Sequence, residues 1–174
     1  MKTVMPSEKS VDELVNSEAD DKPIVMLNLL KYRGEADYSH LDASHSDYGK
    51  KVTGEEAYSE YGKVVVKLVW SLGGQILWSG RPRLSLISPD EESWDSIALV
   101  QYPSRKAFIE MVASDEYQAA VHHRTAALED SRLIETQAVK LPKLILMASR
   151  AFVRFKSLLK FNKQEINYRN LKNF

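Results

Sequence analysis

The segment from Trp94 to Gln137 constrains the fold more than any other part of this 174-residue chain. Residues 94–102 alternate as a strand does, and a Pro-Ser pair then ends the strand and caps a helix. Ser114 interrupts that helix and caps a second piece that is expected over residues 115–128. A last strand is expected over residues 131–140. The segment therefore predicts strand, turn, broken helix and strand.

The first half of the chain supplies two more strands and the clearest helix. Residues 24–32 form an apolar run rich in strand-forming side chains, and both of its faces look buried. Apolar residues recur at the helical period over residues 54–72, and two glycines end the run. Residues 75–88 predict a strand that bends around Gly80, and residues 34–53 predict a long polar loop.

The order of these elements predicts an α+β, ferredoxin-like βαββαβ fold with one four-stranded antiparallel sheet and its helices on one face. We expect this domain to occupy residues 1–141, with a short N-terminal helix over residues 7–16. Residues 142–174 are expected to form a C-terminal helical extension. Because both faces of strand 24–32 look apolar, a second subunit is the simplest cover for the face without helices.

The C-terminal extension differs in charge from the rest of the chain. From Pro142 onward there are eight basic residues and one acid, Glu165, although the formal net charge of the whole chain is zero. Apolar side chains at helical spacing from Leu144 predict a basic amphipathic helix. Its apolar face can dock on the protein or on a second subunit, or lie in an anionic membrane surface. The residues expected to contact the membrane or partner are Arg150, Phe152, Arg154 and Phe155.

Composition excludes several kinds of site. The chain has no cysteine, so it can form no disulfide, thiolate nucleophile or Cys-ligated metal centre. The N-terminus lacks the apolar core of a secretory signal, and no apolar run approaches the roughly 20 residues that cross a bilayer. We therefore expect a cytoplasmic protein, with peripheral membrane association through the tail as the alternative. No nucleic-acid partner is expected.

The sequence resembles the domain-of-unknown-function family numbered 1330, which lies within the dimeric α/β-barrel group of ferredoxin-like folds. The resemblance covers roughly residues 24–139. It depends on five blocks: IVMLNLLKYR, TGEEAYSEYG, GGQILWSG, WDSIALVQYPSRKAF, and SDEYQ followed by HHRTAALEDSRLI. The resemblance implies a homodimer in which two sheets face each other, with a small-molecule pocket between each sheet and its own helices. It implies no established reaction.

Arg124 is the first candidate for the site. It lies on the same helix face as Tyr117 and Leu128, and a guanidinium on an apolar face needs a partner. It could hold a carboxylate or enolate, or it could be a structural arginine paired with Glu129 or Asp130.

Asn28 and several aromatic side chains complete the candidate site. Asn28 interrupts an apolar strand and could polarise a substrate carbonyl, or be a satisfied core amide. Tyr61, Tyr117 and His123 are candidate acids or bases. Packing is the alternative for the aromatic residues, and a surface position is the alternative for His123. The expected substrate-binding aromatic residues are Tyr58, Trp78, Trp94 and Tyr102.

No metal and no cofactor are expected. The loop residues His40, Asp42, His45 and Asp47 could bind a divalent metal, but their spacing matches no recognised site, and a solvated loop is the expectation. A histidine near an asparagine is similar to the arrangement in haem-degrading and quinone-forming monooxygenases of the same superfamily. This similarity is at the level of the fold alone, and it makes haem a minor alternative.

The sequence thus predicts a homodimer that binds a small molecule. As an enzyme it would catalyse proton transfer on, or oxygenation of, a small carbonyl or aromatic compound. The alternatives are a non-catalytic ligand-binding or membrane-peripheral protein that uses its basic tail, and a purely structural dimer with a filled core.

Overall fold

The computed structural model describes residues 2–16 and 22–137, which belong to one unit of the chain, Met1–Ala138. The predicted C-terminal helix and its contact residues Arg150, Phe152, Arg154 and Phe155 lie outside the described residues. The division into domains at residue 141 therefore stays a prediction.

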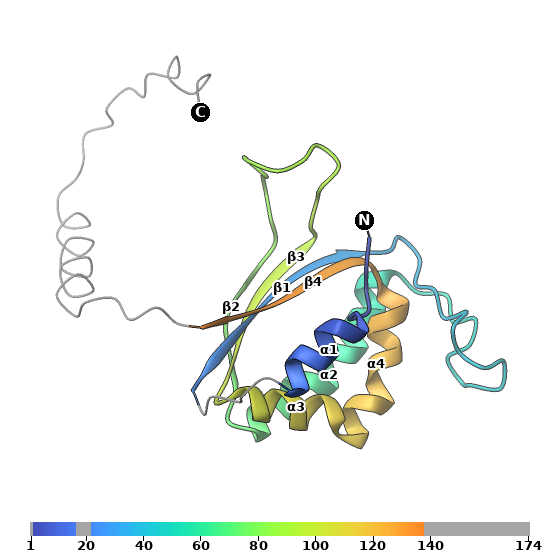
Figure 1. Cartoon of the computed structure of the whole chain (residues 1–174). Coiled ribbons are helices and arrows are strands. Elements are labelled where there is room, and N and C mark those ends of the chain that lie inside the picture. The colour runs from blue at the N-terminus through green and yellow to red at the C-terminus, as the bar shows by residue number, and fades with distance from the viewer. Residues whose placement is uncertain (1, 17–21, 138–174) are drawn as a thin grey trace, which may run out of the picture. The chain divides into compact units, whose positions relative to one another are not determined.

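The fold is ferredoxin-like, as the order of the predicted elements indicated. The strands form one antiparallel sheet in the order β2-β3-β1-β4, and the helices lie on one side of it (Figure 1). None of the helices in the described ranges is long and apolar enough to cross a membrane. The elements are α1 (Glu8–Asn16), β1 (Ile24–Tyr32), α2 (Gly54–Ser71), β2 (Gln75–Gly80), β3 (Ser96–Tyr102), α3 (Arg105–Ala113), α4 (Asp115–Ala127) and β4 (Leu128–Gln137).

Local capping explains where the helices begin. Thr53 and Glu56 form a capping box at the start of α2, each side chain accepting from the other's backbone N–H. The Ser104 hydroxyl caps α3 by accepting from Ala107 N–H, and Ser114 ends α3 while capping α4. The break at Ser114 is therefore where the sequence placed it.

Three strands differ from their predicted bounds, and of these β3 differs only in that it begins at Ser96 and not at Trp94. β2 ends at Gly80, because the chain beyond it contains Pro82, which has no N–H for a ladder. β4 begins at Leu128, directly after α4, and not at Ser131. Leu128 is fully buried and pairs with Tyr32 across a β-bulge. Because this buried residue takes part in the sheet, the strand begins directly where the helix ends.

The helix-facing side of the sheet carries the core. One cluster joins Leu30 and Leu128 to Tyr38 of the 34–53 loop and to alanines of α2 and α4. A second joins Met26 and Tyr102 to the inner faces of α2 and α3. Small side chains at the α2–α4 contact let the two helices approach closely.

The other side of the sheet carries an apolar row that crosses all four strands. The register places Trp78 beside Leu99, Leu99 beside Leu27, and Leu27 beside Ile134. Trp78 is 52% exposed and Ile134 45% exposed. The β2–β3 connection rises on this side of the sheet (Figure 1), and its side chains Leu84, Leu86 and Ile87 are largely exposed.

Candidate functional site

A line of four phenol rings runs between the sheet and the two long helices. Tyr32 of β1 lies 5.5 Å from Tyr58 of α2, Tyr58 lies 5.3 Å from Tyr61, and Tyr61 lies 5.9 Å from Tyr117 of α4, measured between ring centroids. Tyr61 is buried, and the other three rings are partly buried. The structure thus brings together Tyr58, Tyr61 and Tyr117, three of the residues that the sequence singled out.

The phenols of Tyr58 and Tyr61 hold their protons at neutral pH. Burial raises the pKa of Tyr58 and of Tyr61 above the ordinary tyrosine range. The positive charge of Arg124 acts on both hydroxyls in the opposite direction, but burial is the larger effect. The Tyr58 and Tyr61 hydroxyls are therefore hydrogen-bond donors that feel the charge of a cation.

Arg124 reaches out of the last turn of α4 toward the N-terminal segment. Its Nη1 donates to the Val4 carbonyl at 2.9 Å, and its Nη2 donates to the Ser131 hydroxyl at 3.1 Å. Neither Glu129 nor Asp130, the partners that the sequence suggested, takes part in these bonds. Two of the five guanidinium donors are used in this way.

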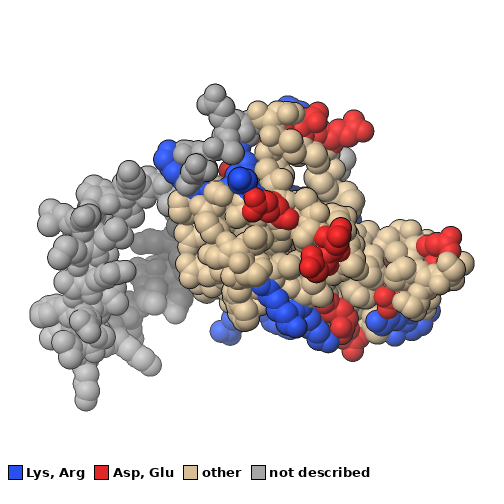
Figure 2. All heavy atoms as spheres, turned by 90° about the horizontal axis from the view of Figure 1, so that it is seen from below, with Lys and Arg blue, Asp and Glu red and all other residues tan. Residues whose placement is uncertain are grey.

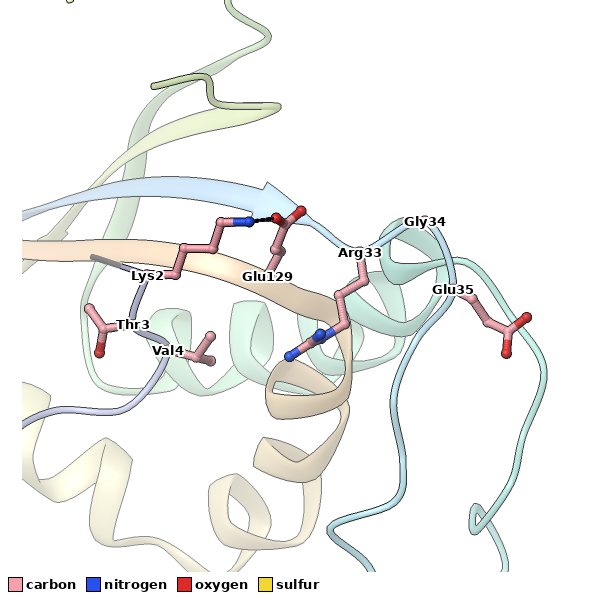
Figure 3. Close-up of a pocket in the computed structure, with 7 residues that line it drawn as sticks. All are labelled: Lys2, Thr3, Val4, Arg33, Gly34, Glu35 and Glu129. Carbon is pink, nitrogen blue, oxygen red and sulfur yellow. Dashed lines mark hydrogen bonds and ion pairs between the residues drawn. The ribbon is translucent and has the colours of Figure 1, made fainter. Parts of the chain in front are cut away.

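An open hollow lies beside Val4 (Figure 3), the residue whose carbonyl accepts from Arg124. It has a volume of about 660 Å³ and is lined by Lys2, Thr3, Val4, Arg33, Gly34, Glu35 and Glu129. Lys2 and Glu129 form an ion pair across it, and Glu35 pairs with Lys51. The Arg33 Nε is buried without a hydrogen-bond partner among the described residues. Sequence reasoning missed Arg33, because nothing in its local pattern distinguishes it from a loop arginine.

Charge does not separate into large patches on the helix side of the described domain. Basic and acidic side chains are interspersed over the face in Figure 2. The selection of a charged ligand on this face therefore has to come from individual side chains such as Arg33 and Arg124.

The remaining sequence candidates lie in other surroundings. Asn28 lies on the helix-facing side of β1 and donates from Nδ2 to the Met26 carbonyl at 3.2 Å. Tyr102 belongs to the neighbouring core, where its ring lies 5.2 Å from Phe108.

The two candidate tryptophans are outside the phenol line. Trp78 lies on the opposite side of the sheet, with its ring over Gly80. The Trp94 ring makes a cation–π contact with the Arg132 guanidinium, whose carbon lies 5.2 Å from the ring centroid.

His123 belongs to a second polar cluster, between α4 and the 34–53 loop. Its Nδ1 is hydrogen-bonded to the Tyr38 hydroxyl at 2.8 Å, and Tyr38 is 2% exposed. Burial and the neighbouring His122 lower the pKa of His123. The loop folds back over α4 and buries most of the His122 side chain. Loop paths have no period, so spacing could not reveal this contact.

Comparison with known proteins gives a family and a fold. The domain of unknown function DUF1330 matches residues 48–137. RPA0582, a protein of unknown function from Rhodopseudomonas palustris, is 35% identical, with a TM-score of 0.71 over 81% of this chain and 100% of that chain. Methylated RPA0582 is 37% identical, with a TM-score of 0.72 over 80% of this chain and 96% of that chain.

A dimeric protein of unknown function and ferredoxin-like fold from Bacteroides fragilis NCTC 9343 is more remote. It is 11% identical, with a TM-score of 0.41 over 69% of this chain and 99% of that chain. No curated protein matches the sequence. The DUF1330 match spans more than half of the chain, and the likeness to RPA0582 extends over most of it. The chain therefore belongs to the DUF1330 family, as the sequence blocks indicated.

Proposed function

We propose that this protein is a homodimer that binds a small anionic carbonyl compound in the hollow beside Val4 and catalyses proton transfer on it. One observation carries the proposal: the Arg124 guanidinium, whose charge acts on the protonated phenols of Tyr58 and Tyr61, bonds to Val4 in the wall of an open hollow. Cations and neutral donors in a water-poor site stabilise a developing oxyanion.

The ligand would bind by replacing one hydrogen-bond acceptor of Arg124. Val4 offers the guanidinium a neutral carbonyl, whereas a carboxylate or enolate oxygen is a stronger acceptor. An anion in the hollow can therefore replace the Val4 carbonyl. Arg33, whose buried Nε lacks a hydrogen-bond partner within residues 2–16 and 22–137, supplies a second cation at the wall.

The protonated phenols beside Arg124 favour proton transfer over oxygenation as the reaction, because they can act as general acids. A phenol with a raised pKa keeps its proton until charge develops on the substrate, and can then donate it. Tyr61 would fill this role, with the Tyr117 ring 5.9 Å away as its neighbour. Asn28 retains one amide N–H and its carbonyl oxygen, with which it could orient the substrate.

The first experiment titrates the protein with a panel of small 2-oxo and 3-oxo carboxylates. Binding is measured from the change in the protein's NMR chemical shifts. Arg124→Lys is expected to weaken binding by about 10–100-fold, because lysine cannot reproduce the bidentate geometry. Arg81→Gln is the matched control, since Arg81 pairs with Glu55 on the surface. Equal affinity of the wild type and Arg124→Lys would contradict the proposal.

A second experiment separates an enzyme from a binding module. Exchange of the ligand's acidic C–H for deuterium in D₂O reports proton transfer without a known product. Tyr61→Phe is expected to retain binding and slow the exchange by about 100-fold. Binding with no protein-dependent exchange would favour the non-catalytic alternative.

The apolar row and the β2–β3 connection support the homodimer. An antiparallel sheet with one face covered by helices needs a cover for an apolar second face. Trp78, Leu99, Leu27 and Ile134 supply such a face in this protein. A second subunit laid sheet to sheet would bury this row together with Leu84, Leu86 and Ile87.

The alternative function rests on the basic tail. Membrane contact through residues 142–174 is tested by flotation of the full chain with anionic liposomes, compared with an Arg150→Glu, Arg154→Glu variant. The loss of flotation in the variant would support membrane association. Equal behaviour of the two proteins would leave docking on the protein body as the role of the tail.

A further inference from the structure

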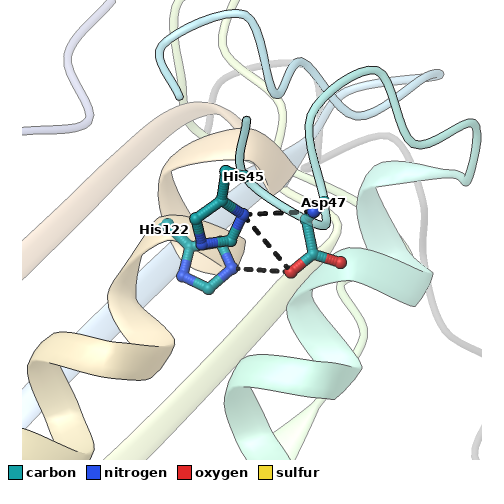
Figure 4. Close-up of side chains that lie close together, drawn as sticks. All are labelled: His45, Asp47 and His122. Carbon is teal, nitrogen blue, oxygen red and sulfur yellow. Dashed lines mark hydrogen bonds and ion pairs between the residues drawn. The ribbon is translucent and has the colours of Figure 1, made fainter. Parts of the chain in front are cut away.

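Three metal-ligating side chains converge where the 34–53 loop folds over α4 (Figure 4). His45 and Asp47 come from the loop and His122 from the helix, so the cluster joins positions far apart in the sequence. One ligand atom from each residue lies within 4.8 Å of the other two. The phenol line beside Arg124 contributes none of these atoms.

The ligand atoms point toward one another. His122 Nε2 lies 3.1 Å from Asp47 Oδ2, and His45 Nδ1 lies 4.0 Å from the same oxygen. His45 Nδ1 also accepts the Asp47 backbone N–H at 3.1 Å, which holds this nitrogen beside the cluster, and its lone pair has to leave that N–H to bind an ion. Lys50 Nζ donates to the other carboxylate oxygen, Oδ1, at 3.1 Å, and this leaves Oδ2 between the two imidazoles.

The distances suit a transition-metal ion. Nitrogen and oxygen ligands lie about 2.0–2.2 Å from Zn²⁺ in tetrahedral sites, which puts ligand atoms about 3.3 Å from one another. The Asp47–His122 pair already meets this separation. The His45 side chain is 39% exposed, so it has room to turn from the Asp47 N–H toward an ion.

The surroundings hold the cluster in place. The Asp37 backbone N–H donates to the Ala126 carbonyl at 2.9 Å, which fastens the loop to α4. Tyr38 fixes Nδ1 of His123, whose Nε2 lies 3.9 Å from Asp47 Oδ2, about as near as His45 Nδ1. The side chains of Asp47 and His122 are only 20% and 15% exposed. These two ligands are already held together, so they lose little freedom when an ion binds.

We propose that His45, Asp47 and His122 bind one divalent transition-metal ion of the Zn²⁺ class. Two imidazoles and one carboxylate are ligands that Zn²⁺ and its neighbours prefer, and they leave a fourth position for water or a ligand. The ion takes the place of the hydrogen bond between His122 Nε2 and Asp47 Oδ2, and a neutral His122 binds it through Nε2 with its ring proton on Nδ1. This site goes beyond the proposed function and does not depend on it.

The test is isothermal titration of ZnCl₂ into the full chain, prepared without a histidine tag. One ion is expected per chain. Asp47→Asn and His122→Ala are each expected to weaken binding by at least about 100-fold. His40→Ala is the matched control, because His40 lies in the same loop but bonds to the Asp37 carbonyl, outside the cluster. The control is expected to bind as the wild type does.

A second readout covers variants that fail to fold. His45→Ala changes an exposed side chain, and circular dichroism checks that it folds. It is expected to lose at least about 10-fold in affinity. Nitrogen-15 NMR of the wild type should show Zn²⁺-dependent shifts in the His45 and His122 rings, with His40 unchanged. A wild type that binds no Zn²⁺, or binding that persists in a folded Asp47→Asn, His122→Ala protein, would overturn the proposal.

Discussion

The backbone N–H of Thr3 donates to Asp130 Oδ1 at 2.8 Å, joining the N-terminal segment to the start of β4. The Ser131 N–H donates to the Thr3 carbonyl at 2.8 Å, so the two segments pair along their backbones. Asp130 is buried. Residues 2–4, which form one wall of the hollow, are therefore positioned by this carboxylate.

Replacing this carboxylate should destabilise the protein in a pH-dependent way. Burial raises the pKa of Asp130, but hydrogen bonds from Arg132 and from the Thr3 and Ser131 amides outweigh it, and the net pKa is lowered. Because the folded pKa lies below the unfolded one, the stabilisation is present above about pH 4 and is lost as the pH falls through the folded pKa.

Asp130→Asn is therefore expected to lower the free energy of unfolding by about 1–3 kcal/mol at pH 7. Urea denaturation at pH 7 and at pH 3 measures this, and the difference from the wild type should shrink at the lower pH. Asp12→Asn, on the exposed helix α1, is the control. A difference that does not change with pH would contradict the assigned role of the ionised carboxylate.

Replacing two glycines of α2 by alanine should change the free energy of unfolding in opposite directions. A Cβ on Gly54 would lie 2.5 Å from the Arg33 carbonyl oxygen and 2.7 Å from the Arg33 nitrogen, and it would also meet the Ala127 carbonyl. These are backbone atoms that cannot move aside. Gly54→Ala is expected to cost about 2–4 kcal/mol of unfolding free energy.

Gly62 is the matched position, because a Cβ there meets nothing within 4 Å. Gly62→Ala is expected to stabilise the protein by up to about 1 kcal/mol through helix propensity. Thermal unfolding of both variants makes the comparison. A Gly54→Ala protein as stable as the wild type would show that α2 and Arg33 do not pack this closely.

The proposed dimer should be sensitive to charge on the apolar row. Trp78→Glu and Ile134→Glu are each expected to raise the dimer dissociation constant by at least about 100-fold, because an unpaired carboxylate is buried on association. Light scattering after size exclusion measures the mass across a range of concentrations. Trp70→Glu is the control, since Trp70 is exposed on α2, on the helix side of the sheet. A wild-type protein that is monomeric at all concentrations would contradict the dimer.

Most of the fold could be predicted from sequence, whereas only part of the site could. The capping serines and the helical period of residues 54–72 are local signals, and they indicated the order of the elements. The position of Tyr117 and Arg124 on one helix face also followed from the helical period. The predicted start of β4 was wrong, because it depends on the tertiary burial of Leu128. The predicted end of β2 was wrong, because it depends on Pro82, which lacks a backbone N–H.

The sequence by itself thus determined the ferredoxin-like fold and the family, because periodicity, caps and short blocks are encoded over a few residues. Tertiary structure alone decided that Arg124 bonds to Val4 and not to an acid, and that His122 meets Asp47 and not solvent. Both contacts depend on the path of a non-periodic segment over α4. The segment from Trp94 to Gln137 places Arg124 and His122 on a helix, but only the folded N-terminus and loop supply their partners.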